Sequence, residues 1–263
     1  MPADEVMCFK KRLNSYDDFF QQTLDLWPVN IIVNWQNHFV KTNTVVKRSA
    51  IEFSMKKLPL SFYLREDVLE IAKELLGKVL VTNWEGELTS GRIVETEAYA
   101  GETDRASHAS KGRTERTEVM YGSGGRAYVY LCYGIHQMFN IVTSKEGVPH
   151  AILIRAIEPL EGKEIMLERT GKKSWDKTVT SGPGRVGKAL GFHTSQCGLL
   201  LTGKELYIAD DGYKVKEEDI VSSPRIGVDY AGEHAEWHYR FYLEHSNYVS
   251  GKKSKSPKVQ RKK

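Results

Sequence analysis

The sequence is poor in cysteine and has no long apolar run, and both absences narrow the class of protein. Its three cysteines, Cys8, Cys132 and Cys197, lie far apart, a spacing that forms neither a disulfide framework nor a cysteine-based zinc site. No apolar stretch reaches the roughly 18 residues that a membrane-spanning helix requires. The N-terminus lacks the basic start and apolar stretch of a secretory signal. We therefore expect a reduced, intracellular, soluble protein with no membrane partner.

Acidic residues are absent from the last 13 residues, 251–263, whereas seven of these residues are basic. Without those seven, the 38 Lys and Arg of the chain fall to 31, against 34 Asp and Glu. The net charge of +4 therefore belongs to this tail, because the rest of the chain carries −3. A solvated basic tail suits a phosphate backbone, but it can equally serve solubility.

Composition divides the chain into three parts. Residues 1–54 have clustered Asn, Thr and Gln and no sustained hydrophobic period, apart from an amphipathic stretch at 17–26. We expect residues 1–57 to be a poorly ordered extension. If Met55 is the natural start, residues 1–54 are instead sequence upstream of the protein. A domain-like pattern covers residues 58–249, and residues 250–263 form the basic tail.

The central part is rich in strands. Its β-branched and aromatic runs are bounded by Gly, Asn or Pro, and they do not alternate regularly with helices. This pattern favours an α+β fold over a doubly wound parallel sheet. The expected strands are 78–83, 91–99, 126–133, 135–143, 151–157, 224–230 and 239–243, and the expected helices are 67–76, 161–169 and 186–190.

One expected strand carries two carboxylates on the same face. In Gly91–Tyr99 the period of two places Glu95, Glu97 and Tyr99 together. An edge strand whose glutamates pair with Lys or Arg would explain this pattern. A partly buried glutamate beside an aromatic ring is also how a general base for water is built, so the pattern leaves both interpretations open.

Residues 126–142 predict a β-hairpin with its turn at Gly134. Tyr128 and Tyr130 face one way along the first strand, and aromatic residues within strands usually serve packing. Tyr133 falls at the tip, where no core can cover it. An exposed ring at such a place can act as a wedge inserted into a base stack.

Two further motifs give weaker signals. Gly182–Ala189 has the spacing of a phosphate-binding loop, but Ala189 replaces the hydroxyl that binds magnesium. Nucleotide hydrolysis is therefore disfavoured, although the glycine-rich turn and Arg185 still offer donors to a phosphate. His234 and His238 lack a third ligand, so we expect no metal and no cofactor.

Together these segments resemble one family, the alkyladenine (3-methyladenine, N-methylpurine) DNA glycosylases of base-excision repair. The resemblance covers about residues 58–249, with several long motifs in order. The matching motifs are Gly91–Tyr99, Ala106–His108, Gly112–Thr114, Tyr128–Tyr130, Tyr133–Gly134, Asn140–Ile141, Leu153–Ala156, Glu158–Gly162, Ser181–Pro183 and Tyr230–Gly232.

The resemblance implies a role for each matching site residue. Glu97 corresponds to the glutamate that activates the attacking water, and Arg155 to an arginine beside the water and phosphate. Tyr133 corresponds to the residue that enters the minor groove and fills the space left by the nucleotide. The residues that would hold the flipped base are Tyr99, His108 and Tyr130, which stack on it, and Asn140, which opposes the exocyclic amino group of guanine.

The chain also departs from the family. The family often has Thr-Pro-Arg-Asn where this chain has Thr114-Glu-Arg-Thr117, a difference that weighs against phosphate contacts by this loop. Arg116 is its candidate phosphate-binding residue. The turn after Ile141 is more like that of bacterial members. We therefore expect a cytoplasmic, DNA-associated bacterial enzyme, or a nuclear one if the source is eukaryotic.

These observations predict a single mixed α+β domain with a curved, largely antiparallel sheet, flanking helices and a protruding β-hairpin. The predicted function is that of a monomeric, monofunctional DNA glycosylase. It flips alkylated or deaminated purines out of double-stranded DNA and hydrolyses the N-glycosidic bond, leaving an abasic site. A non-catalytic damaged-base-binding protein is the alternative, and an RNA-binding module is a third. An intact Glu97 disfavours both.

Overall fold

The structure is a computed structural model that describes residues 55–251. The expectations for residues 1–54, including the amphipathic stretch at 17–26, and for residues 252–263 lie outside the described residues.

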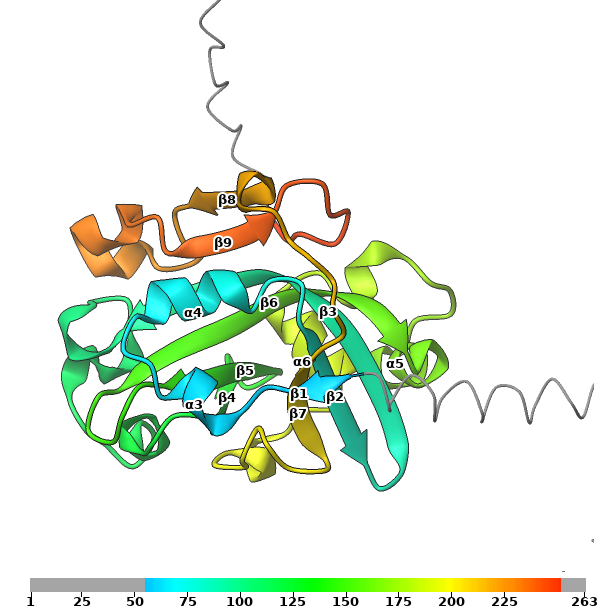
Figure 1. Ribbon diagram of the computed structural model, residues 1–263, viewed down its shortest axis with the longest axis horizontal. Coiled ribbons are helices and arrows are strands. Elements are labelled where there is room, and N and C mark those ends of the chain that lie inside the picture. Colours follow the sequence, from blue (N-terminus) through cyan, green and yellow to red (C-terminus); the bar gives the residue numbers. More distant parts are fainter. Residues whose placement is uncertain (1–54, 252–263) are drawn as a thin grey trace, which may run out of the picture. The chain divides into compact units, whose positions relative to one another are not determined.

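The described chain is built on one nine-stranded sheet whose pairings are all antiparallel (Figure 1). The main path runs β1-β7-β2-β3-β6-β5-β4, while β9 joins β3 and β8 pairs with β9. This arrangement confirms the α+β class. The strands are β1 (Lys56–Lys57), β2 (Val79–Trp84), β3 (Glu87–Ala100), β4 (Ala127–Cys132), β5 (His136–Thr143), β6 (His150–Glu161), β7 (Leu206–Asp210), β8 (Ile220–Ser223) and β9 (Arg240–Leu243).

Short helices flank the sheet. The α-helices are α3 (Leu60–Tyr63), α4 (Val68–Glu74), α5 (Lys163–Thr170) and α6 (Pro183–Ala189). The 3-10 helices are η2 (Gly101–Thr103), η3 (His108–Lys111), η4 (Glu118–Tyr121), η5 (Lys177–Val179), η6 (Thr194–Gln196), η7 (Glu217–Asp219) and η8 (Asp229–Glu236). The predicted helix at 67–76 is confirmed as α4, which begins where the Asp67 carboxylate accepts bonds from the N–H groups of Leu69 and Glu70. It lies across β3, where Thr96 donates to the Ala72 carbonyl (Figure 1).

The longest strand, β3, changes one of its partners at a bulge beside Glu95. Residues 87–92 pair with β2, whereas residues 95–97 pair with β9. On its other side β3 pairs with β6, and the register shifts both before and after Glu95. Bulges re-aim side chains in this way beside functional sites. Because β3 is an inner strand here, the edge position expected in one interpretation of its two glutamates is wrong, whereas the expected pairing with arginines is confirmed by Arg155 and Arg240.

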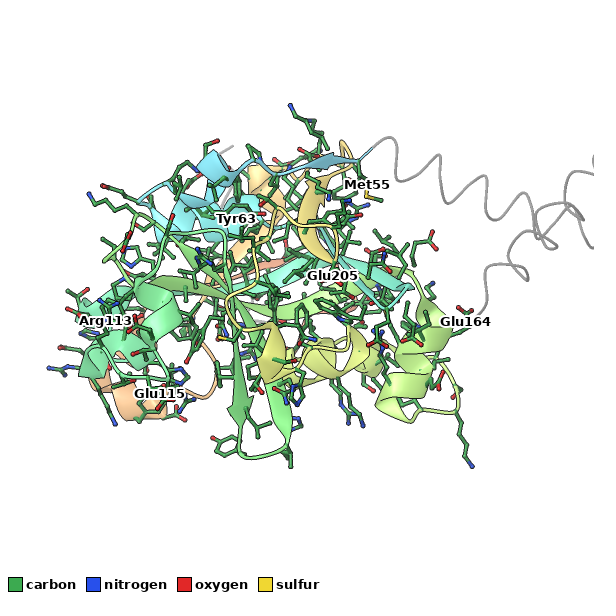
Figure 2. The ribbon with its side chains drawn as sticks, turned by 90° about the horizontal axis from the view of Figure 1, so that it is seen from below. Met55, Tyr63, Arg113, Glu115, Glu164 and Glu205 are labelled. Carbon is green, nitrogen blue, oxygen red and sulfur yellow. The ribbon has the colours of Figure 1, made fainter. Side chains whose placement is uncertain are left out.

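The predicted hairpin is confirmed as β4 and β5, which extend away from the body of the molecule (Figure 2). At its tip the Ile135 N–H donates to the Cys132 carbonyl over 3.1 Å. The two central residues, Tyr133 and Gly134, have φ angles of 50° and 71°. Two positive φ angles in a two-residue turn are the feature of type I′ hairpins, which match the twist of the strands.

Several expected boundaries were wrong. Residues 224–230 form a loop and the start of η8 instead of a strand. Within this loop the Ile226 N–H donates to the Glu97 carboxylate and not to a neighbouring strand. The helix expected from residue 161 begins at Lys163, because β6 continues to Glu161 and Gly162 turns the chain with a φ of 74°. The helix expected from residue 186 begins at Pro183, and β7 and β8 were not expected at all.

Candidate active site

An aromatic cavity of about 40 Å³, partly open to solvent, lies between β3, the hairpin and the 3-10 segments η3, η4 and η8. It brings together four predicted site residues, Tyr99, His108, Tyr130 and Asn140. The other lining residues are Ala106, Ser107, Met120, Tyr128, Ala151 and Tyr230.

Glu97 lies on β3 two residues before Tyr99, and its side chain is fully buried. Its Oε2 accepts a hydrogen bond of 2.9 Å from the Tyr99 hydroxyl and lies 3.1 Å from Arg155 Nη1. Its Oε1 accepts a bond of 2.8 Å from the Ile226 N–H. Burial and the Glu97 charge raise the pKa of Tyr99 well above its usual value, so the phenol keeps the proton it donates.

A second buried carboxylate, Glu95, holds Arg155 in place. Its Oε1 accepts bonds from Arg155 Nε at 2.9 Å, Arg240 Nε at 2.7 Å and the Ser250 hydroxyl at 3.0 Å. Its Oε2 accepts from the Ser250 N–H at 2.6 Å. Burial alone would lower the pKa of Arg155, but Glu97 and Glu95 raise it above its usual value, so this guanidinium stays charged between them.

The two glutamates differ in the donors that contact them. A carboxylate offers about four lone-pair sites. Glu95 accepts from four donors, three at Oε1 and one at Oε2, whereas three donors contact Glu97, two at Oε2 and one at Oε1. Donors from β3, β6 and the loop before η8 thus hold the Glu97 carboxylate in one orientation.

One wall of the cavity is a cluster of rings around His108. The His108 ring lies edge-on to Tyr130, with 4.6 Å between ring centres and 74° between planes. Its Nδ1 is 2.8 Å from the Tyr128 hydroxyl. Burial, and to a lesser extent the charge of Arg116, lowers the pKa of His108 to about 4. The imidazole is therefore neutral near pH 7, and the wall is an uncharged stacking surface.

Asn140 lies at the floor of the cavity on β5, directly opposite Tyr128 in the hairpin register. It is 3% exposed, and its Nδ2 donates to the carbonyls of Tyr128 at 3.1 Å and Met138 at 3.4 Å. These two bonds fix the amide, so it cannot turn aside to admit a larger base.

A buried ion pair ties together two loops that border the cavity. Arg225 Nη2 donates to Asp104 Oδ1 over 2.9 Å, and both side chains are fully buried. Asp104 also accepts from the Ala106 N–H, at the start of the segment that carries His108. Arg225 directly precedes Ile226, whose N–H binds Glu97. The pair thus couples the stacking wall to the position of the carboxylate.

The remaining predicted site residues lie outside the cavity. Arg116 is exposed near its wall, with its Cζ 5.1 Å from the centre of the Tyr130 ring. Figure 2 shows its neighbour Glu115 on the segment beside the hairpin. Tyr133 is 90% exposed at the hairpin tip. Arg185 is exposed on α6, and Arg155 is buried at 6% exposure.

Sequence reasoning missed three features of this site. Tyr128 was expected to serve packing, but it also lines the cavity and contacts His108. The Ile226 N–H is a backbone group, which no side-chain pattern can reveal. Tyr230 belongs to the matching motif Tyr230–Gly232, but the family resemblance assigned it no role.

The two weaker motifs have structural explanations. In α6, a Cβ at Gly187 would collide with the Gln137 carbonyl, so this glycine permits close packing on β5. His234 Nδ1 accepts the Arg105 N–H at 3.1 Å, and its ring stacks on Trp237. Among residues 55–251 no three His, Cys, Asp or Glu side chains are placed to hold a metal ion. No helix in this part of the chain is long and apolar enough to cross a bilayer.

Comparisons with known proteins bear on the same residues. Residues 61–247 match the family model described as methylpurine-DNA glycosylase. The "Putative 3-methyladenine DNA glycosylase" of Desulfitobacterium hafniense is 47% identical over 206 residues, covering 75% of this chain and 100% of that protein. Proteins with the same name from Methanocella arvoryzae and Bacillus cytotoxicus are 49% and 44% identical, over 74% of this chain in each case and 96% and 99% of their own lengths.

Proposed function

The chain belongs to the methylpurine-DNA glycosylase family, and from this membership we propose that it flips damaged purines out of double-stranded DNA and excises them. Membership makes it a monofunctional enzyme that hydrolyses N-glycosyl bonds. The proposed substrates are alkylated and deaminated purines, and the enzyme acts as a monomer. The observation that carries the proposal is the buried Glu97 carboxylate, oriented by three donors and bonded to a tyrosine that lines an aromatic cavity.

Base flipping brings the substrate to this carboxylate. A base inside the duplex cannot reach a buried carboxylate, and extrusion costs a few kcal/mol, less for a damaged or mispaired base. Stacking on an aromatic ring offsets about 1–3 kcal/mol of that cost. The rings of Tyr99, His108 and Tyr130 supply this stacking, and the exposed ring of Tyr133 fills the gap in the duplex.

Glu97 performs the hydrolysis. Cleavage of the N-glycosidic bond develops positive charge on the sugar, which an adjacent carboxylate stabilises. The same carboxylate accepts a proton from the water that attacks the sugar carbon. The base leaves with the bonding electron pair, and its alkylation or protonation lowers the cost of this step.

The arginines divide into two groups. Arg155 is buried between the two carboxylates, where it orients Glu97 and the water beside the phosphate of the flipped nucleotide. Arg116 and Arg185 are exposed and contact the DNA backbone, which positions the duplex without reading its sequence. The bacterial relatives support a DNA-associated enzyme of the cytoplasm.

The experiment that tests this function compares Glu97→Gln with the wild-type chain on duplexes that carry hypoxanthine, ethenoadenine or a methylpurine. The substitution keeps shape and polarity but removes the base. We expect excision to fall at least about a hundredfold, the usual size of general-base catalysis, with lesion binding retained. Glu115→Gln, in an exposed loop, is the matched control. Lesion binding without any abasic product from the wild-type chain would instead indicate the non-catalytic alternative.

A further inference from the structure

The three most exposed large hydrophobic or aromatic side chains of the described residues flank the same region. Tyr133 and Ile135 are 90% and 73% exposed at the hairpin tip, and Tyr230, which lines the cavity, is 69% exposed in η8. Water disfavours apolar surface, so exposed rings beside a cavity mark a contact surface. The hairpin tip has its role in the proposed function, whereas Tyr230 has none.

The structure holds Tyr230 in a defined position. Its hydroxyl donates to the Ala106 carbonyl over 3.0 Å. The next residue, Ala231, is 1% exposed and packs with Ala106 and Val228. The hydroxyl therefore donates its proton to a group of the protein, so a ligand would contact the ring of Tyr230 and not its hydroxyl.

Tyr230 shares the cavity lining with Tyr130 of the hairpin and with Tyr99, whose hydroxyl bonds Glu97. Because its ring both lines the cavity and is largely exposed, it lies at the entrance of the cavity. A nucleotide whose base lies on the inner rings must place its sugar at this entrance, because the bond to be broken points outward toward the duplex.

We propose that Tyr230 is a further substrate-binding residue, whose ring packs against the deoxyribose of the extruded nucleotide and retains it in the cavity. This inference rests on the proposed function. It assigns Tyr230 to holding the flipped nucleotide and not to breaking the bond. Loss of the ring weakens lesion binding, while loss of the hydroxyl alone has little effect.

The test uses Tyr230→Ala, which removes the ring, and Tyr230→Phe, which keeps it. Both are made in the full chain, alone and with Glu97→Gln, so that binding is measured without cleavage. We expect Tyr230→Ala to weaken binding to an ethenoadenine duplex about tenfold, in line with one lost aromatic contact. Binding to the matched undamaged duplex should change less than about twofold, and Tyr230→Phe should bind both like the parent.

Controls separate this proposal from a structural role. Tyr213→Ala removes another exposed tyrosine, 48% exposed and outside the cavity, whose ring packs on the Arg92 guanidinium, and it should leave lesion binding unchanged. Equal loss of binding to damaged and undamaged duplexes would overturn the proposal, as would unchanged lesion binding by Tyr230→Ala. If that variant melts early, Tyr230→Leu replaces it under the same criteria. Absence of excision by the wild-type chain would refute the proposed function itself, whatever these variants do.

Discussion

His108 is the titratable ring in the wall of the cavity, and its surroundings keep it neutral. Burial and Arg116 lower its pKa from 6.5 to about 4 in the folded protein. Between these two values the unfolded chain binds the proton and the folded chain resists it, so stability falls as the pH drops through this window. The wild-type chain should therefore lose more stability than His108→Gln between about pH 6.5 and pH 4.

Urea unfolding at several pH values measures this difference, and an NMR titration of the His108 ring measures its pKa directly. Arg116→Gln removes the second cause of the shift, so it should move the titration of His108 partly back toward 6.5. A wild-type ring that titrates at its ordinary value would contradict the proposed burial of this wall.

Asn140 should set selectivity against guanine. Its amide is fixed by the Tyr128 and Met138 carbonyls, so a purine with a 2-amino group meets a side chain that cannot move aside. A clash or an unpaired polar group costs about 1–3 kcal/mol, or roughly ten- to hundredfold in rate. Asn140→Ser should raise excision of guanine relative to hypoxanthine, and it should lower the hypoxanthine rate because a pocket contact is lost.

Single-turnover excision from duplexes that differ only in the target base measures this ratio. Asn247→Ser, at an exposed asparagine outside the cavity, is the matched control. If the guanine-to-hypoxanthine ratio is the same in Asn140→Ser and in the control, selectivity arises from another part of the cavity.

The β4–β5 hairpin combines a favourable turn with one unfavourable residue. Tyr133 has a φ of 50°, a conformation that costs a non-glycine residue about 1–2 kcal/mol, whereas Asn-Gly is the preferred pair for this turn. Tyr133→Asn should therefore increase the free energy of unfolding by up to about 1 kcal/mol while it weakens excision and lesion binding.

The measurement is urea denaturation together with single-turnover excision. Tyr133→Phe keeps both the ring and the backbone strain, so it should match the wild-type chain in both assays. A less stable Tyr133→Asn would show that the exposed ring supports the hairpin instead of DNA.

Elements with local signals were predictable from the sequence. A helix cap at Asp67 and a turn glycine at Gly134 act over a few residues, and both α4 and the hairpin formed where expected. Elements that depend on distant partners were not. Residues 224–230 have strand-like composition, yet Arg225 and Ile226 bind Asp104 and Glu97, more than 120 residues away in the chain.

The residues of the candidate site also divide into those with a local sequence signal and those that depend on distant partners. The motifs of the family resemblance singled out Glu97, Tyr99 and Tyr130, and the structure places both tyrosines in the cavity lining and Glu97 in a hydrogen bond with Tyr99. The partners that orient Glu97 were harder to predict. They include a backbone N–H at Ile226 and a guanidinium, Arg155, that is itself held by Glu95. Burial and partner geometry arise only in the folded chain. For this reason the sequence could not decide whether Glu95 is an ion-paired residue or a general base.

For the whole molecule, charge separates the last residues from the rest. All of the net positive charge comes from residues 251–263, which we propose act as a DNA-binding tail. A chain that ends at Gly251 should bind damaged and undamaged duplexes more weakly, and the salt dependence of its binding should decrease because fewer counterions are released. Binding isotherms at several salt concentrations measure this slope. An unchanged slope would make the tail unrelated to DNA binding.

The hydrogen bonds of Ser250 indicate where the folded unit ends. Its N–H donates to Glu95 Oε2 over 2.6 Å, and its carbonyl accepts Arg240 Nη2 over 2.7 Å, both in a buried site. We propose that the folded unit includes β1 at its start and Ser250 at its end. A chain of residues 55–251 should therefore unfold with the same free energy as the full chain.

A chain of residues 55–249 lacks the four hydrogen bonds that Ser250 makes with Glu95, Arg155 and Arg240, although these three buried charges keep their contacts with one another. Because a hydrogen bond to a charged group contributes about 1.5–3 kcal/mol, the loss of these bonds should make this chain less stable by at least about 3 kcal/mol. Chemical denaturation of the two chains measures the difference, and it also bears on function, since Glu95 holds the Arg155 that contacts Glu97. The shorter chain should lose excision under conditions in which it is still folded, whereas the longer one should keep it. Equal stability of the two chains would show that water replaces Ser250 in the buried network.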